Sequence, residues 1–333
     1  MKPLNKVIVN KDTSFNPIWI MRQAGRYLPE FKEIRKKNPD FINLCLNDYL
    51  SSEITLQPLR RFDLDAAIIF SDILMTPYAL GQNVTFKKNY GPILGDLNFS
   101  HINKVDKKTF KKKLKPVYKS MKSLSVKLKG KNKCLIGFAG APWTTLVYMI
   151  NRKSPKKNIS TNLINDDLLV KKTLKKILYF TKQHIKNQVE SGATLIQIFD
   201  SWAGLVKNKN LPRLIYNPTQ ELVRYTKSLK VPIICFPRNI ENYKEYTRVV
   251  KPDAVNIDYN IDIKKLSKQI DIPIQGGLDP RILLTDKNRV KKETKKILDM
   301  FKDHPYIFNL GHGVLPKTKP SMVEYLVKLV KDY

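Results

Sequence analysis

Short apolar runs alternate with amphipathic stretches along most of the chain. Eight runs have the length and composition of buried strands. They cover residues 17–21, 66–70, 134–138, 194–199, 232–236, 254–257, 272–275 and 306–310. Between them, apolar positions recur at helical spacing. The predicted helices cover residues 41–59, 167–191, 218–228, 240–249, 262–269, 286–303 and 321–331.

The order of these elements predicts the fold class. Strands that alternate with helices pair in parallel, because each helix carries the chain back to the start of the next strand. Eight such units predict a single α/β domain over residues 1–333, a (β/α)8 TIM-type barrel. Residues 81–133 are predicted as an insertion between the second and third strands, first polar and glycine-containing and then a lysine-rich helix.

The charge is strongly basic, with 61 Lys and Arg against 29 Asp and Glu and a formal net charge of +32. Arginine accounts for only 12 of these residues, and the lysines follow the polar faces of the predicted helices. We therefore interpret the lysines as solvated helix surface. The alternative is a DNA- or RNA-binding protein, which such a charge also permits; we expect no nucleic-acid partner.

The location of the protein is predicted from features that the chain lacks. The apolar runs are far shorter than the roughly 18 residues of a membrane helix, and residues 1–9 contain no apolar signal core. Cys45, Cys134 and Cys235 lie far apart and form no CxxC pair. These features predict a cytoplasmic protein with reduced thiols, no disulfide and no membrane partner.

Polar residues and glycines cluster just after the predicted strands, where TIM barrels carry their active sites. These clusters cover residues 22–27, 71–72, 140–145, 200–204, 276–280 and 311–313. Arg22 and Arg26 offer two guanidinium groups to carboxylates, and Asp72 and His312 add a lone acid and a lone imidazole. We find no nucleotide-binding glycine motif and no metal-ligand cluster. The pattern therefore indicates an anionic substrate and catalysis without cofactor or metal.

Five blocks, in order along the chain, resemble the uroporphyrinogen decarboxylases. They are RQAGRYLPE at 22–30, AIIFSDIL at 67–74, GFAGAPWT at 137–144, QIFDSWAG at 197–204 and FNLGHG at 308–313. The resemblance spans residues 17–330. It implies a single (β/α)8 barrel, a homodimer, and removal of carboxyl groups from the four acetate arms of the tetrapyrrole uroporphyrinogen III, giving coproporphyrinogen III. It also implies that no prosthetic group takes part.

The resemblance further implies roles for individual residues. Arg22 and Arg26 resemble the family's ligands for the substrate carboxylates, with Gln23, Ala24 and Gly25 shaping the loop between them. Asp72 resembles the aspartate that faces the pyrrole N–H groups and stabilises a pyrrole cation. The implied substrate contacts are completed by Tyr148, Ser201 and His312, with Phe199 as a candidate contact to the ring edge.

Each of these residues also has a purely structural interpretation. The alternatives are an ion pair for Arg22, a helix cap for Asp72, core packing for Tyr148 and Phe199, a turn for Ser201 and an inert loop for His312. The proton donor stays open between Arg22, a substrate carboxyl group and a held water, since a guanidinium is a poor acid.

The chain departs from the family pattern at three places. Residues 151–157 read NRKSPKK where a glycine-rich run is common, Gly277 replaces an asparagine, and Arg238 adds an arginine after the fifth predicted strand. One further alternative is a methyltransferase on the same barrel. Such enzymes need a zinc site built from His and Cys, and the three cysteines here are isolated.

Overall fold

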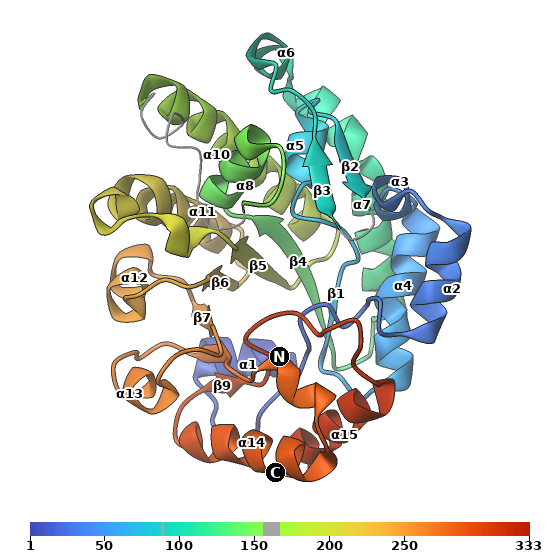
Figure 1. Ribbon diagram of the computed structural model, residues 1–333, viewed down its shortest axis with the longest axis vertical. Helices are drawn as coiled ribbons and strands as arrows, with labels where there is room; N and C mark the ends of the chain where they lie inside the picture. The colour runs from blue at the N-terminus through green and yellow to red at the C-terminus, as the bar shows by residue number, and fades with distance from the viewer. Residues whose placement is uncertain (88–89, 156–166) are drawn as a thin grey trace.

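A curled parallel sheet, surrounded by helices, forms the centre of the molecule (Figure 1). The computed structural model describes residues 1–87, 90–155 and 167–333. The sheet has seven strands in the order β1-β4-β5-β6-β7-β8-β9. They are β1 (Ala66–Ile68), β4 (Cys134–Gly140), β5 (Leu195–Asp200), β6 (Ile233–Pro237), β7 (Ala254–Ile257), β8 (Ile274–Gly276) and β9 (Tyr306–Ile307). Seven of the eight predicted strands are thereby confirmed, β7 with the predicted bounds and the other six with shifted ends.

The remaining predicted strand, the first in the sequence at residues 17–21, is wrong as a strand. Only Ile18 forms a bridge, parallel to Phe308 next to β9. On its other side the Ile18 carbonyl accepts the backbone N–H of Asp65 at 2.8 Å, while the Asp65 carboxylate accepts the N–H of Ile18 at 2.7 Å. A side chain thus takes a donor that a β-ladder would use. The segment still lies between β9 and β1 and takes the first place of a TIM-barrel-like wall, which is not fully closed by strand pairing.

The outer helices mostly follow the amphipathic stretches of the sequence. They are α2 (Pro29–Lys37), α3 (Phe41–Cys45), α4 (Asp48–Arg61), α7 (Lys107–Lys127), α10 (Asp167–Glu190), α11 (Asn217–Ser228), α12 (Tyr243–Val250), α13 (Ile263–Ser267), α14 (Lys287–Met300) and α15 (Pro320–Lys331). The predicted helix over 41–59 is wrong as one unit. It divides at Asn47, whose side chain accepts the N–H of Leu50 at 2.9 Å and starts α4 in a new direction.

Shorter elements lie at the carboxyl end of the barrel. They are α5 (Met75–Ala79), the hairpin of β2 (Val84–Lys87) and β3 (Gly91–Leu94), α6 (Phe99–Lys104), α8 (Pro142–Asn151) and the short turns η1 (Ala203–Leu205), η2 (Asn208–Asn210), η3 (Pro212–Tyr216) and η4 (Pro280–Leu284). The hairpin lies beside α5 in Figure 1. Sequence patterns did not predict it, because its strands are only four residues long and half exposed.

The first helix, α1 (Pro3–Asn10), closes the amino end of the barrel. Its buried residues Leu4, Val7 and Ile8 pack with the first residues of the strands, such as Ala66 and Leu195, in one apolar cluster. A second and larger cluster fills the space between the sheet and the outer helices. Since α1 fills one end, only the carboxyl end of the barrel is left for a ligand.

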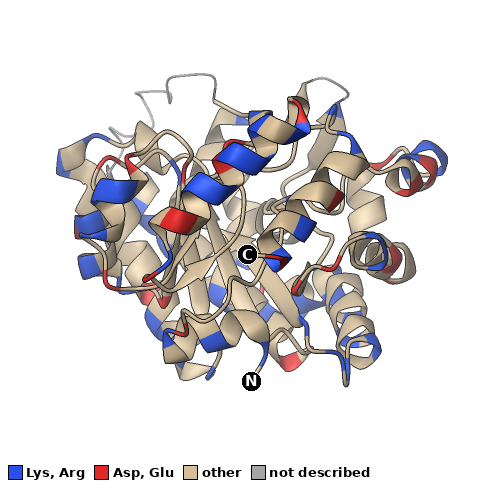
Figure 2. Cartoon of the chain, turned by 90° about the horizontal axis from the view of Figure 1, so that it is seen from below, with Lys and Arg blue, Asp and Glu red and all other residues tan. Residues whose placement is uncertain are grey.

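Positions of Lys, Arg, Asp and Glu are spread over the outer helices and their connections in this view of the ribbon (Figure 2). Helix α14 shows the arrangement that the sequence predicted for lysine. Val290, Ile297 and Leu298 are buried, whereas Lys291, Lys292 and Lys295 are exposed on the opposite face. The lysines of this helix are therefore solvated surface, as interpreted from the sequence.

Candidate active site

The carboxyl ends of the strands, here called the barrel mouth, carry the loops that the sequence singled out. The loop after residue 20 forms a tight turn that holds Arg22 in the left-handed region, at φ +63°. A residue other than glycine seldom adopts this conformation, and such strain is concentrated at functional sites. Gly25 makes the turn possible, because a Cβ there would lie 3.0 Å from the carbonyl oxygen of Arg22.

Gln23 fixes this turn to the sheet from below. It is completely buried, donates from Nε2 to the carbonyl of Ala66 at 3.0 Å, and accepts the N–H of Ile20 at Oε1. Both ends of the amide are therefore bonded to backbone, and Gln23 shapes the loop without presenting its side chain to the mouth. Ala24 is half-buried against the core and takes the same part.

The loop 308–314 packs directly against the arginine turn. The Met21 N–H donates to Asn309 Oδ1 at 2.9 Å, and the Val314 N–H donates to the Met21 carbonyl, also at 2.9 Å. Gly313 gives Arg22 its space, since a Cβ there would lie 2.3 Å from Arg22 Cδ. This contact places His312 beside Arg22, although 290 residues separate them.

Asp72 sits at the mouth in the loop after β1, with a carboxylate that water reaches only in part. Its Oδ1 accepts the N–H of Leu74 at 2.8 Å, two residues further on, which is an Asx turn. It is not a helix cap, because α5 begins at Met75 with Leu74 at its N-cap position and without a side-chain cap. Burial raises the pKa of Asp72 to about 6, although the Leu74 N–H and the Arg22 charge both oppose the shift. A desolvated carboxylate that stays mostly ionised at neutral pH is a strong electrostatic partner for a cation.

Arg22 links the charged groups of the mouth. Burial lowers its pKa, the Asp72 carboxylate opposes that shift, and the charge of Arg26 adds to it. Arg22 nevertheless keeps more than a third of its surface accessible. Both observations hold if the guanidinium lies in a concavity, surrounded by protein but open to a ligand. Among the described residues Arg22 forms no ion pair within 4 Å, so the ion-pair interpretation has no support here.

His312 lies in the same electrostatic environment. Burial lowers the pKa of His312 to about 4, and the charges of Arg22 and Arg238 add to the shift. Its Nδ1 accepts the N–H of Gly313 at 2.7 Å, which assigns the ring proton to Nε2. At neutral pH His312 is therefore an uncharged imidazole that offers one N–H donor to an anion.

Two aromatic side chains line the mouth beside Asp72, on the segments that follow β4 and β5. Tyr148 on α8 is buried and meets Trp202 edge to face, with ring centroids 5.8 Å apart. Burial raises the pKa of Tyr148, and Asp72 and Arg22 both act on it electrostatically, so its hydroxyl faces the same groups. Gly140 permits this approach, because a Cβ there would lie 2.9 Å from Thr145 on α8 and 3.3 Å from Ile73 beside Asp72.

Ser201 and Phe199 reach the mouth from β5. Phe199 is the one residue of β5 that keeps accessible surface, and its ring packs edge to face on Phe138 at 5.7 Å. Ser201 is half-buried in the turn that follows. The turn is held by a relay in which Thr144 Oγ1 donates to Asp200 at 2.6 Å and accepts the N–H of Trp202 at 3.0 Å. Burial raises the pKa of Asp200 to about 7.

Comparison with known proteins identifies the family. The profile described as uroporphyrinogen decarboxylase (URO-D) matches residues 1–333. The chain belongs to the uroporphyrinogen decarboxylase family. Relatives that carry this name include one from Rickettsia bellii, 41% identical over 95% of each chain, and one from Rickettsia felis, 38% identical over 98% of this chain and 97% of its own.

A solved structure supports the fold of the family. A methyltransferase from Methanosarcina mazei superposes with a TM-score of 0.78 over 99% of this chain and 97% of its own, at 15% sequence identity. At this identity the likeness shows a shared fold alone. The zinc site of the methyltransferase alternative has no counterpart in residues 1–87, 90–155 and 167–333, where no cluster of three or more His, Cys, Asp or Glu could hold a metal ion.

Two of the departures from the URO-D pattern can be related to the local backbone conformation and contacts. Gly277 adopts φ +99°, a conformation that favours glycine, and a Cβ there would lie 3.0 Å from Ile263. In the loop 151–157, Arg152 ion-pairs with Asp96 at 2.6 Å and bonds to the Leu94 carbonyl, which ties the end of α8 to the β2–β3 hairpin. Lys156 and Lys157 lie outside the described residues.

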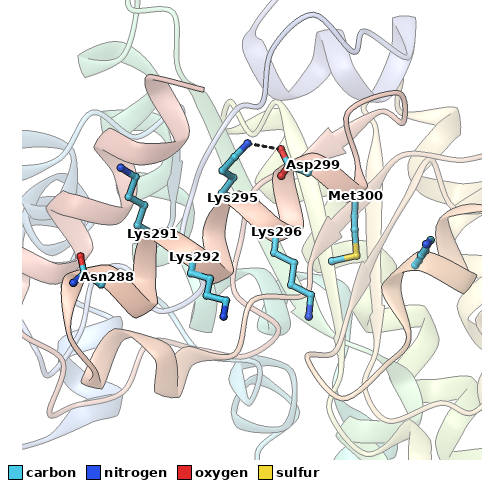
Figure 3. A pocket seen from close by; sticks show the side chains of 8 residues that line it. Asn288, Lys291, Lys292, Lys295, Lys296, Asp299 and Met300 are labelled. Carbon is cyan, nitrogen blue, oxygen red and sulfur yellow. Dashed lines mark hydrogen bonds and ion pairs between the residues drawn. The ribbon is translucent and has the colours of Figure 1, made fainter.

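Outside the mouth, the described residues form a lysine-lined hollow and contain three buried cysteines. A surface hollow of about 650 Å³ lies on α14, lined mainly by Lys291, Lys292, Lys295 and Lys296, and its one marked interaction is the 2.9 Å pair of Lys295 with Asp299 (Figure 3). None of the residues named at the mouth lines it. Cys45, Cys134 and Cys235 are buried and free. Within the described part of the chain, no helix is long and apolar enough to span a bilayer.

Proposed function

We propose that this protein is a uroporphyrinogen decarboxylase that removes the carboxyl groups from the four acetate arms of uroporphyrinogen III. The observation that carries the proposal is that Arg22 interacts electrostatically with Asp72, Arg26 and His312 at one barrel mouth. These residues come from three separate blocks of the sequence. Membership of the family supplies the substrate and the reaction.

The geometry suits a polycarboxylate that carries pyrrole N–H groups. Arg22 and Arg26 bind the acid arms, because guanidinium groups form paired hydrogen bonds with carboxylates. Neutral His312 donates its Nε2–H to a further carboxylate, with Tyr148 and Ser201 as hydroxyl contacts. Asp72 accepts from the pyrrole N–H groups, and Phe199 packs on the ring edge.

The chemical step uses the pyrrole as the electron acceptor. A proton adds to a ring carbon and makes the pyrrole cationic; the bond to the carboxylate then breaks, and its electrons move into the ring as CO2 leaves. A proton adds to the arm's methylene carbon and the ring carbon loses its own, so each turnover replaces one carboxylate by hydrogen. Asp72 stabilises the cation between these events, since a fixed charge in a desolvated site needs little reorganisation. No cofactor takes part in this scheme.

The test is anaerobic incubation of the purified protein with uroporphyrinogen III, followed by separation of the products by carboxyl number. We expect a stepwise series in which each product has one carboxyl group fewer, ending at coproporphyrinogen III. The KM should rise with ionic strength, because the acid arms are held electrostatically. Unchanged substrate after complete folding has been verified would refute the assignment.

We further propose that the protein works as a cytoplasmic homodimer. The support is the family resemblance together with buried, unpaired cysteines. Size-exclusion chromatography with light scattering should give twice the mass of one chain across the concentration range of the assay. A mass of one chain at assay concentrations would rule out the dimer as the working form.

A further inference from the structure

The geometry points to Arg238 as a third arginine of the substrate site, holding an acid arm on the side of the mouth opposite Arg22 and Arg26. This inference rests on the proposed function and adds a residue for which neither the family resemblance nor the five sequence blocks assigns a role. It concerns a substrate-binding group whose effect should appear in KM.

The barrel order places Arg238 across the mouth from Arg22. Counted around the wall, the segment of residues 17–20 takes the first place and is followed by β1, β4, β5 and β6. Arg22 therefore follows the first wall place and Arg238 the fifth, which is the opposite place of eight. Because both side chains lie at the carboxyl end, they can hold two arms of one wide ligand.

The backbone at Arg238 is held rigidly. Its N–H donates to the Asp200 carbonyl at 3.1 Å, and its own carbonyl accepts the N–H of Gly204 at 3.0 Å. The next residue, Asn239, adopts φ +58°, and Gly204 packs so closely on it that a Cβ would lie 2.4 Å from its carbonyl oxygen. A side chain on such a turn is preorganised, which lowers the entropy cost of binding.

The side chain itself is left with unused donors. Arg238 is half-buried, and its Nε is buried with no hydrogen-bond partner among the described residues. A buried guanidinium donor without a partner costs free energy, so a structural role for Arg238 leaves this atom unexplained. An incoming carboxylate would bind the accessible part of the guanidinium, and a small shift of the side chain would bring Nε into the same pair of hydrogen bonds.

Asp258, an acidic group that interacts electrostatically with Arg238, already has hydrogen-bond partners. Asp258 Oδ2 accepts the N–H of Asn239 at 2.6 Å and the Tyr243 hydroxyl at 2.8 Å. Burial raises the pKa of Asp258, while those two hydrogen bonds and the Arg238 charge oppose the shift. Asp258 thus secures the turn and lies close enough to moderate the Arg238 charge, yet it forms no ion pair with Arg238 within the described part of the chain.

The charge of Arg238 extends to the proposed site. Its field acts on both His312 and Arg22, two groups that the other wall of the mouth supplies. With His312 neutral, the cationic groups that meet a substrate are Arg22, Arg26 and Arg238. Three guanidinium groups around one ring match a substrate that carries acid arms on all sides.

The test compares Arg238→Gln with wild type in steady-state decarboxylation of uroporphyrinogen III. We expect KM to rise about tenfold or more, which is the effect of losing one charge-assisted hydrogen bond, with kcat within about twofold. The dependence of KM on salt should become shallower, because one fewer ionic contact forms. The matched control is Arg248→Gln, which removes an exposed arginine ten residues away on α12 and should leave KM unchanged.

Two further variants and probes keep the outcomes distinct. If Arg238→Gln does not fold, Arg238→Lys decides: KM about threefold higher at unchanged kcat supports the inference, and an unchanged KM overturns it. If wild type has no decarboxylase activity, the proposed function fails, and binding of uroporphyrin measured by fluorescence still tests Arg238. Equal affinity or equal KM in wild type and Arg238→Gln would overturn the inference alone.

Discussion

The two ends of the barrel are built from the same strands but obey different rules. At the amino end, Leu4, Val7 and Ile8 of α1 are buried among apolar side chains. At the carboxyl end, Arg22 and Asn239 adopt left-handed backbone conformations, and Asp72 and Asp200 are desolvated carboxylates. One end gains stability from packing, whereas the other holds conformations and charges that cost stability.

The contrast shows that the residues that stabilise the fold by packing and the residues of the candidate site lie at opposite ends of the barrel. Within the lumen, an amide network lies between the two ends: Gln275 accepts from Trp19 Nε1 at 2.8 Å and donates to Asn256 Oδ1 at 2.6 Å. On the carboxyl-end side of this network, polar groups keep hydrogen-bonding capacity for a ligand. On the amino-end side, the side chains are packed against one another. Substitutions at the two ends should therefore affect different measured quantities.

The largest effect is expected at the mouth, for Asp72→Asn. The amide keeps the shape of the side chain but loses the charge that stabilises the pyrrole cation, so kcat/KM should fall by about a thousandfold. Burial disfavours the carboxylate, so the unfolding temperature should stay the same or rise. Steady-state kinetics and thermal unfolding check both statements. Activity within tenfold of wild type would remove Asp72 from the mechanism.

The opposite result is expected at the amino end, for Leu4→Ala. The side chain is fully buried, so its truncation leaves a cavity and should lower the free energy of unfolding by about 3 kcal/mol. KM and kcat at 25 °C should stay within about twofold, because α1 touches none of the charged groups of the mouth. Urea unfolding and the decarboxylation assay measure the two quantities. A large kinetic effect here would mean that the two ends are coupled.

A smaller effect is expected in the pH dependence that Asp72 gives to activity and to stability. Burial raises the pKa of Asp72 to about 6, so the carboxylate is lost as the pH falls through that value, and kcat/KM should fall about tenfold per pH unit below it. His312, with a pKa lowered to about 4, stays neutral over this range. For stability the sign is reversed. A raised pKa in the folded state favours the acid form, so the contribution of Asp72 is fully present below pH 4 and is lost as the pH rises through about 6.

Much of this comparison was accessible from the sequence. Strand periodicity and the glycine clusters after the strands predicted the parallel barrel and the end that bears the site, because both depend on local composition. In the structure Arg22 interacts electrostatically with Asp72, Tyr148 and His312, and the roles that the family resemblance implies for them stay predictions.

Other features depend on contacts that no local pattern encodes. The segment of residues 17–20 pairs as a bridge because Asp65, far along the chain, takes its N–H. Helix α1 is short, and its partners are the ends of distant strands. The role of Gln23 follows from a hydrogen bond to Ala66, and the unused donor of Arg238 follows from the packing around it. In each case tertiary contact, not propensity, decides the outcome.

The smallest effect is expected for charges that lie away from both ends. Replacing Lys291, Lys292, Lys295 and Lys296 on α14 by glutamine removes four positive charges, yet KM should change by less than about twofold at physiological salt, because solvent and ions screen exposed charges beyond roughly 8 Å. The single charge of Arg238 should matter more than these four together. A KM increase as large as that of Arg238→Gln would show instead that the diffuse positive field of the surface captures the substrate. The claim that KM depends on where a charge lies at the mouth would then be wrong.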